Sequence, residues 1–217
     1  MESSALKEIF ELSTDELITA AIDNNEGVIA SNGALSLQTG ARTGRSPNDR
    51  FIVKEESTSN LIDWGEINKP FDPEKFNLLW DKVEAYLAEK NRYLSRVHVG
   101  AHHDHYIPVN VITESAAHSM FSKLIFIDPN EFNPKAKKEW QIMSAMNFEC
   151  SPEEDGTNSD GCVIINFAAR KVLLAGMKYA GEMKKSMFSA QNFLLPEKNV
   201  LPMHFSSNVN KDGKVSL

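Results

Sequence analysis

The sequence predicts a mixed α/β fold, a mixed sheet with flanking helices, in a single domain over residues 1–217. Three observations support this class. Strand-length apolar runs occur between amphipathic helical stretches without strict alternation. The chain is long enough to bury one sizeable core. Its 41% hydrophobic and 24% charged residues are ordinary for a globular protein in water.

The amino-terminal quarter predicts one helix and two short strands. The helix is expected from about Thr14 to Ala21, with Ser13 or Thr14 as its cap. It stops at residues 24–27, Asn-Asn-Glu-Gly, which tolerate turn conformations. Strands are expected at 34–38 and 51–54. The glycine-rich stretch between these two strands must therefore be a loop.

A second helix is the clearest element of the sequence. Asp72 caps it, a proline follows at its first position, and an apolar stripe repeats at helical spacing through Phe76, Leu79, Trp80, Val83 and Leu87. Beyond it we expect strands at 93–99 and 109–113, a helix at 114–121 and a strand at 124–127.

The last third predicts a hairpin followed by a helix. Strands at 162–167 and 171–176 are joined through residues 168–170, and a helix is expected from Ser186 to Phe193. Cys150 and Cys162 lack the spacing of a zinc or redox motif, so we expect a structural role and no disulfide framework.

Charge and composition exclude several classes of partner. The formal net charge of −7 argues against nucleic acid and anionic membranes, which require a basic face. No apolar run approaches the roughly 20 residues of a membrane helix, and the amino terminus lacks signal-peptide features. We therefore expect a cytoplasmic protein that holds any anionic ligand at a local basic site.

Three segments carry candidate chemistry. Arg45 lies in the glycine-flanked loop T-G-R-S-P, where a guanidinium can grip a carboxylate through two parallel hydrogen bonds. Lys184 and Lys185 are expected near a helix start, where cations interact unfavourably with the helix dipole. Lysines at positions that cost stability indicate a functional role. His204 follows an apolar stretch and is placed to present its imidazole at a strand end. For each segment the alternative is an ordinary structural or solvated side chain.

A histidine-rich stretch suggests zinc, but its pattern argues against a site. His98, His102, His103 and His105 surround Asp104. Strand alternation and the turn at 100–101 are expected to scatter these rings over different faces, which favours an exposed polar turn. The sequence also has no G-x-x-x-x-G-K-[ST] loop for a nucleotide phosphate.

Several motifs in a fixed order resemble the ATP-dependent phosphoenolpyruvate carboxykinases. They are T-G-R-S-P at 43–47, F-I-V at 51–53, Y-A-G-E-M-K-K-S-M-F at 179–188, N-F-L-L-P at 192–196 and M-H-F-S-S-N-V at 203–209. Each motif alone is modest, whereas the ordered set is specific. The resemblance implies the amino-terminal, substrate-binding domain of such an enzyme.

The resemblance also implies roles for five residues. Arg45 would bind the carboxylate of oxaloacetate or phosphoenolpyruvate, and Tyr179 would lie beside the substrate or carbon dioxide. Lys184 would sit near the transferred phosphoryl group. Lys185 and His204 would coordinate a catalytic Mn²⁺. Arg45, Lys184 and Lys185 are thus the expected catalytic residues of a gluconeogenic lyase that converts oxaloacetate and ATP to phosphoenolpyruvate, carbon dioxide and ADP, with Mg-ATP in the complete enzyme.

Two departures from the family pattern leave an alternative open. Arg96, Tyr106 and Asn110 stand where the family carries an aspartate and two arginines. The family's phosphate-binding loop and a third metal ligand follow a strand like that at 213–217, so we expect the nucleotide-binding domain to be absent from this chain and the chain alone to be inactive. The alternatives are a non-catalytic module that binds a dicarboxylate or a protein, or a zinc protein.

Overall fold

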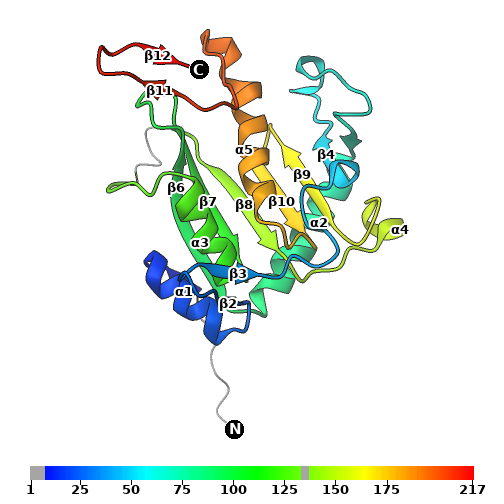
Figure 1. The fold of residues 1–217 in the computed structure, drawn as a ribbon. Helices are drawn as coiled ribbons and strands as arrows, with labels where there is room; N and C mark the ends of the chain where they lie inside the picture. Colours follow the sequence, from blue (N-terminus) through cyan, green and yellow to red (C-terminus); the bar gives the residue numbers. More distant parts are fainter. Residues whose placement is uncertain (1–7, 133–136) are drawn as a thin grey trace.

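The computed structural model describes residues 8–132 and 137–217. Its centre is an eight-stranded mixed sheet in the order β1-β6-β7-β8-β10-β9-β4-β5 (Figure 1). Antiparallel pairing occurs between β6 and β7 and between β9 and β10, and the other neighbours are parallel. The strands are β1 Glu8–Phe10, β4 Arg50–Val53, β5 Pro70–Phe71, β6 Arg92–Val99, β7 Ile107–Thr113, β8 Trp140–Ala145, β9 Cys162–Asn166 and β10 Lys171–Ala175.

Helices cover both faces of this sheet. They are α1 Thr14–Asp23, α2 Pro73–Ala88, α3 Ala116–Ile125, α4 Pro152–Asp155 and α5 Gly181–Leu194. Along β9, Ile164 packs in the cluster that contains the α2 stripe, while its neighbours Val163 and Ile165 pack in the cluster that contains Met183 and Met187 of α5. This alternation is the period of two expected for a strand buried on both faces. In Figure 1, α5 and α3 cross the near face of the sheet.

Short hairpins and 3₁₀ turns complete the chain. One hairpin pairs β2 Gly27–Ile29 with β3 Leu35–Leu37, and a second pairs β11 Asn208–Val209 with β12 Val215–Ser216. Among the described residues, the 3₁₀ turns are Pro47–Asp49, Ser59–Leu61 and Pro196–Lys198. Within the two described ranges, no helix has the length and apolar character that crossing a membrane would require.

Capping interactions fix where the helices begin. In α1, the Ser13 hydroxyl accepts the Glu16 N–H at 3.3 Å and the Glu16 carboxylate accepts the Ser13 N–H at 2.8 Å, a reciprocal capping box. In α2, the Asp72 carboxylate accepts the N–H groups of Glu74 and Lys75, each at 2.9 Å. Both helices predicted from these residues are confirmed, α1 extending two residues beyond the predicted end.

The region around α3 departs from the predicted pattern. The helix begins at Ala116, because the Ser115 hydroxyl accepts the His118 N–H at 3.1 Å and the Glu26 carboxylate accepts the Ala116 and Ala117 N–H groups at 2.9 Å. It continues to Ile125, so the strand predicted at 124–127 is wrong, and only an isolated bridge joins His98 to Ile127. Strand β8 was not predicted, although it is central to the sheet.

The carboxyl-terminal elements confirm the predicted hairpin and correct the helix start. β9 and β10 pair in antiparallel fashion, and Arg170 in their connection adopts a positive φ of 54°. Helix α5 begins at Gly181 instead of Ser186, so both lysines lie inside its first turns. The buried Cys150 and Cys162 thiols are free, as predicted, with their Sγ atoms 3.8 Å apart.

Candidate active site

The loop that carries Arg45 is fastened to the start of α5 by one buried carboxylate. Glu182 Oε1 accepts the backbone N–H of Ser46 at 2.8 Å, and the Glu182 side chain is fully buried. The other oxygen, Oε2, lies 3.9 Å from Nε of Arg50 and has no hydrogen-bond partner among the described residues. A buried charge is stable only when it is compensated, and here the compensation comes from the Ser46 N–H and the Arg50 guanidinium. The carboxylate therefore links the loop, β4 and α5.

Above this carboxylate lies a group of positively charged side chains, which we call the basic cluster: Arg45, Arg50, Lys184 and Lys185. Arg45 is exposed, whereas Arg50 is only 25% exposed at its side chain. Burial lowers the pKa of Arg50, and the nearby Glu182 charge opposes that effect. A cluster with more positive than negative charge favours a bound anion.

His204 and the two lysines form the part of the site with unusual electrostatics. Partial desolvation lowers the pKa of Lys185, and the charges of Arg45, Lys184 and Arg50 lower it further. The charges of Lys185 and Lys184 lower the pKa of His204. Lys184 Nζ donates to His204 Nε2 at 3.2 Å, since an ammonium has no lone pair to accept with.

The lysine amine and the imidazole fit a divalent metal ion in their chemistry. A ligand lysine must be neutral, and the lowered pKa of Lys185 is the required direction. The lone pair of His204 Nε2 is engaged by Lys184 in this structure, so an ion at this nitrogen would replace the Lys184 ammonium. Two such ligands leave the coordination sphere open to substrate or to ligands outside the described residues.

Tyr179 is positioned by a buried histidine and a close backbone approach. His118 Nε2 donates to the carbonyl of Lys178 at 3.0 Å, while Nδ1 accepts the Ser144 hydroxyl at 3.1 Å. A Cβ on Gly181 would lie 2.5 Å from the Tyr179 ring, so only glycine lets this half-buried ring lie against the helix start. The backbone just before Tyr179 and the ring of Tyr179 are therefore both constrained.

Arg45, Lys184 and Lys185 lie close enough to His204 for their charges to lower its pKa, and Tyr179 lies just before α5, the helix that carries both lysines. Their roles toward a substrate stay predictions. Sequence reasoning missed Glu182 and Arg50. The only signal for Glu182 was its position inside E-M-K-K, and no local pattern indicated that Arg50 is buried.

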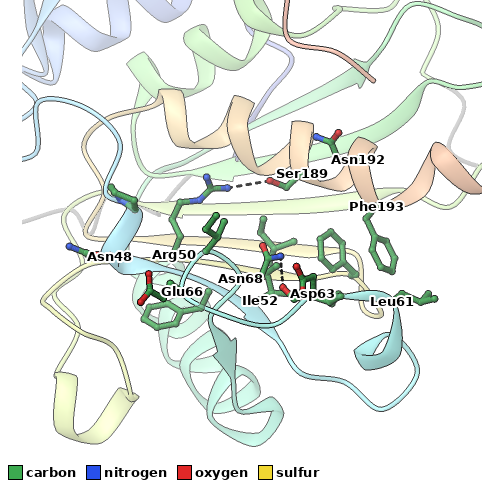
Figure 2. A pocket seen from close by; sticks show the side chains of 16 residues that line it. Asn48, Arg50, Ile52, Leu61, Asp63, Glu66, Asn68, Ser189, Asn192 and Phe193 are labelled. Carbon is green, nitrogen blue, oxygen red and sulfur yellow. Dashed lines mark hydrogen bonds between the residues drawn. The ribbon is translucent and has the colours of Figure 1, made fainter. Parts of the chain in front are cut away.

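One cavity lies beside this site. It encloses about 420 Å³ between α5 and the segment 61–68. Figure 2 shows Arg50 reaching toward α5, where its guanidinium donates to Ser189 Oγ at 3.3 Å. The stacked rings of Phe167 and Phe193, 4.2 Å apart, form part of the apolar wall. Arg50 is the one member of the basic cluster that lines this cavity.

A second cavity, of about 400 Å³, lies by the start of the Arg45 loop. Its lining includes Arg42, Lys178 and Glu149. Arg42 forms an ion pair with Asp160 and donates to Ser159 Oγ at 2.8 Å, which anchors the loop to the turn before β9. The Arg45 loop is thus held at both ends, by Arg42 and by Ser46.

The histidine-rich turn differs from its predicted arrangement. The ligand atoms of His102, His103 and Asp104 lie within 4.8 Å of one another, so the predicted scattering of the histidine rings is wrong for His102 and His103. Alternation applies on the strand, but these residues lie in the turn beyond it. His98 is separate, stacked on Tyr106 with ring centroids 4.3 Å apart.

Fold and site together define a class of protein: a mixed α/β scaffold with a cluster of arginine and lysine side chains beside a histidine. Comparison with known sequences makes the class specific. The family model for phosphoenolpyruvate carboxykinase matches residues 7–217. The chain belongs to the ATP-dependent phosphoenolpyruvate carboxykinase family.

Curated relatives carry the same name. The chain is 45% identical over 208 residues to phosphoenolpyruvate carboxykinase (ATP) of Bacillus pumilus strain SAFR-032, covering 95% of this chain and 39% of that protein. For the Bacillus subtilis strain 168 and Bacillus mycoides strain KBAB4 proteins of the same name, the identities are 44% and 46%, covering 95% of this chain and 40% of each relative. The chain therefore spans about two fifths of the length of these relatives.

Proposed function

We propose that this chain supplies the substrate- and metal-binding residues of an ATP-dependent phosphoenolpyruvate carboxykinase. In the proposed reaction the bond between C3 and C4 of oxaloacetate breaks, carbon dioxide leaves, and the resulting enolate oxygen takes the γ-phosphoryl group of ATP to give phosphoenolpyruvate and ADP. The observation that carries the proposal is the gathering of Arg45, Lys184, Lys185 and His204 over the buried Glu182 carboxylate, on a chain of this family.

Arg45 is the proposed anchor for the substrate carboxylate. Its loop is fixed at Ser46 by the hydrogen bond to Glu182, so the exposed guanidinium extends from backbone that is held in position. Two parallel hydrogen bonds to a carboxylate would define both the position and the orientation of oxaloacetate. Tyr179, whose ring is held against Gly181, would contact the substrate or the departing carbon dioxide.

Lys185 and His204 are the proposed holders of Mn²⁺. When bound, such an ion stabilises negative charge developing on the enolate oxygen as a Lewis acid. The surrounding cations favour the neutral form of Lys185, which leaves its lone pair free. Lys184, released from His204, would place its ammonium beside the phosphoryl group in transfer.

ATP binding is proposed to require residues outside this chain, because its sequence contains no G-x-x-x-x-G-K-[ST] loop. The 217 residues alone are therefore expected to be inactive. This expectation separates binding of oxaloacetate, which the basic cluster supports, from turnover, which needs a nucleotide site.

A chimaeric enzyme tests the proposed function. Residues 1–217 replace the matching part of the Bacillus pumilus enzyme, and phosphoenolpyruvate formation from oxaloacetate and ATP is measured beside the intact relative. We expect activity from the chimaera. Arg45→Gln should raise the KM for oxaloacetate by about 10- to 100-fold, which is the loss of affinity expected when a charged bidentate hydrogen-bonded contact is removed. A folded, ATP-binding chimaera without activity would contradict the proposal and favour a non-catalytic dicarboxylate-binding module.

A further inference from the structure

The turn between β6 and β7 gathers three metal-ligating side chains outside the candidate active site. His103 Nε2 lies 3.1 Å from Asp104 Oδ2, and His102 Nδ1 lies 3.9 Å from the same oxygen. One ligand atom from each of these residues lies within 4.8 Å of the other two. All three side chains are exposed, so an ion has free access from solvent.

These separations match those of ligands around one small ion. With metal–nitrogen and metal–oxygen bonds of about 2.0–2.2 Å, neighbouring ligands of a tetrahedral site lie about 3.4 Å apart. The two separations from Asp104 Oδ2, 3.1 Å to His103 and 3.9 Å to His102, bracket that value, and the two histidine nitrogens lie within 4.8 Å of each other. Small side-chain rotations would therefore complete three corners of a tetrahedron, without any change in the backbone.

The turn is held in place by its own contacts. The N–H groups of His105 and Tyr106 both donate to the His102 carbonyl at 2.9 Å. The Lys137 ammonium donates to the His103 carbonyl at 2.6 Å and lies 3.8 Å from the centre of the Tyr106 ring. The turn closes a long antiparallel pair of strands, so the ligand-bearing backbone is supported from both sides.

The imidazole rings are also ordered relative to each other. The His102 ring stacks on His103 with centroids 4.6 Å apart and on His105 with centroids 4.9 Å apart. His102 Nδ1 accepts the Asp104 N–H at 3.2 Å, a long contact that an ion at this nitrogen would replace. His105 is a neighbour of the group without contributing to it, since its ligand atoms do not converge with the other three.

We propose that His102, His103 and Asp104 form a surface site for a divalent zinc-type ion, with a fourth position open to water. Two imidazoles and one carboxylate suit Zn²⁺, whereas Mg²⁺ and Ca²⁺ prefer sites built from oxygen alone. The site shares no residue with the basic cluster. Gly100, just before the turn, lies beside the later part of α5, since a Cβ on it would sit 3.2 Å from Nε2 of Gln191, seven residues or about 10 Å along the helix from Lys184.

A matched set of variants tests this site by zinc calorimetry on the whole chain. His103→Phe and His105→Phe make the same substitution two residues apart, and each keeps an aromatic ring in the stack. The unaltered chain should bind one zinc ion at the turn with micromolar affinity. His103→Phe and Asp104→Asn should weaken that binding at least about tenfold, because removing even a residue that only hydrogen-bonds to a metal ligand lowers metal affinity by about this factor. His105→Phe should leave the affinity unchanged.

Two further measurements keep the test decisive. Histidine side-chain NMR should show zinc shifting the His102 and His103 ring signals and sparing His98, and a Lys185→Ala, His204→Ala double variant should retain that response. Far-ultraviolet circular dichroism verifies that each variant folds. The proposal is overturned if zinc gives no heat, if His103→Phe binds as tightly as the parent, or if the double variant abolishes the response at the turn.

Discussion

Replacing Glu182 with glutamine removes the negative charge beneath the basic cluster while keeping the shape of the side chain. At 3.9 Å and an effective dielectric of about 20, the attraction between Glu182 and Arg50 is roughly 4 kcal/mol before desolvation is counted. Desolvation of the buried carboxylate offsets part of this attraction. In Glu182→Gln the amide nitrogen would also face the Arg50 guanidinium. We expect the free energy of unfolding to fall by about 1–3 kcal/mol.

Urea unfolding followed by circular dichroism measures this loss. For a domain of this size the midpoint should fall by about 0.3–1.5 M urea, taking a slope of about 2–3 kcal/mol per molar urea. The exposed Glu197, just beyond α5, offers a matched control, and Glu197→Gln should unfold at the same urea midpoint as the parent chain. Hydrogen exchange at the Ser46 amide should accelerate in Glu182→Ala, which removes the acceptor, more than in Glu182→Gln. The reasoning is refuted if Glu182→Gln unfolds at the parent midpoint.

Three further predictions concern the scaffold. Asp72→Ala removes the acceptor of two N–H groups at the start of α2 and should lower the free energy of unfolding by about 1 kcal/mol in urea titrations; an unchanged midpoint would show that the cap is dispensable. Burial lowers the pKa of His118 below 6.5, with Glu26 and Glu114 opposing, so the unfolded chain is protonated at a higher pH than the folded chain and stability falls as the pH drops below about 6.5. His118→Gln should therefore reduce the difference in unfolding free energy between about pH 7.5 and 5.5 by roughly 1 kcal/mol. An unaltered pH dependence of stability would contradict this. Gly181→Ala should displace the Tyr179 ring, seen as shifted Tyr179 NMR signals, and unshifted signals would argue against the close approach.

Local signals predicted much of the fold. Capping residues and helical periodicity located α1 and α2, and turn residues located the β9–β10 hairpin. Strand β8, W-Q-I-M-S-A, was missed because it is buried on both faces and lacks the alternation of a half-buried strand. The error at 124–127 has the opposite cause. The first half of this apolar run is the end of α3, and the start of that helix is fixed in part by Glu26, 90 residues earlier in the chain.

The candidate site was predictable as a set of residues but not as an arrangement. Motif order along the chain identified Arg45, Tyr179, Lys185 and His204. The contact between Ser46 and Glu182 spans 136 residues, so no spacing in the sequence reveals it. Likewise, alternation on a strand could not describe His102 and His103, because the turn between β6 and β7 brings the two side chains back to one side.

Paramagnetic broadening by Mn²⁺ tests the central claim most directly. Mn²⁺ is titrated into the ¹⁵N-labelled chain, and weak binding suffices because broadening reports even a small occupied fraction. The account predicts that signals around Lys185 and His204 broaden first and that this effect disappears in a Lys185→Ala, His204→Ala double variant. Broadening confined to other parts of the chain, or equal broadening in the double variant, would contradict the assignment of these residues as the metal-binding part of the carboxykinase site.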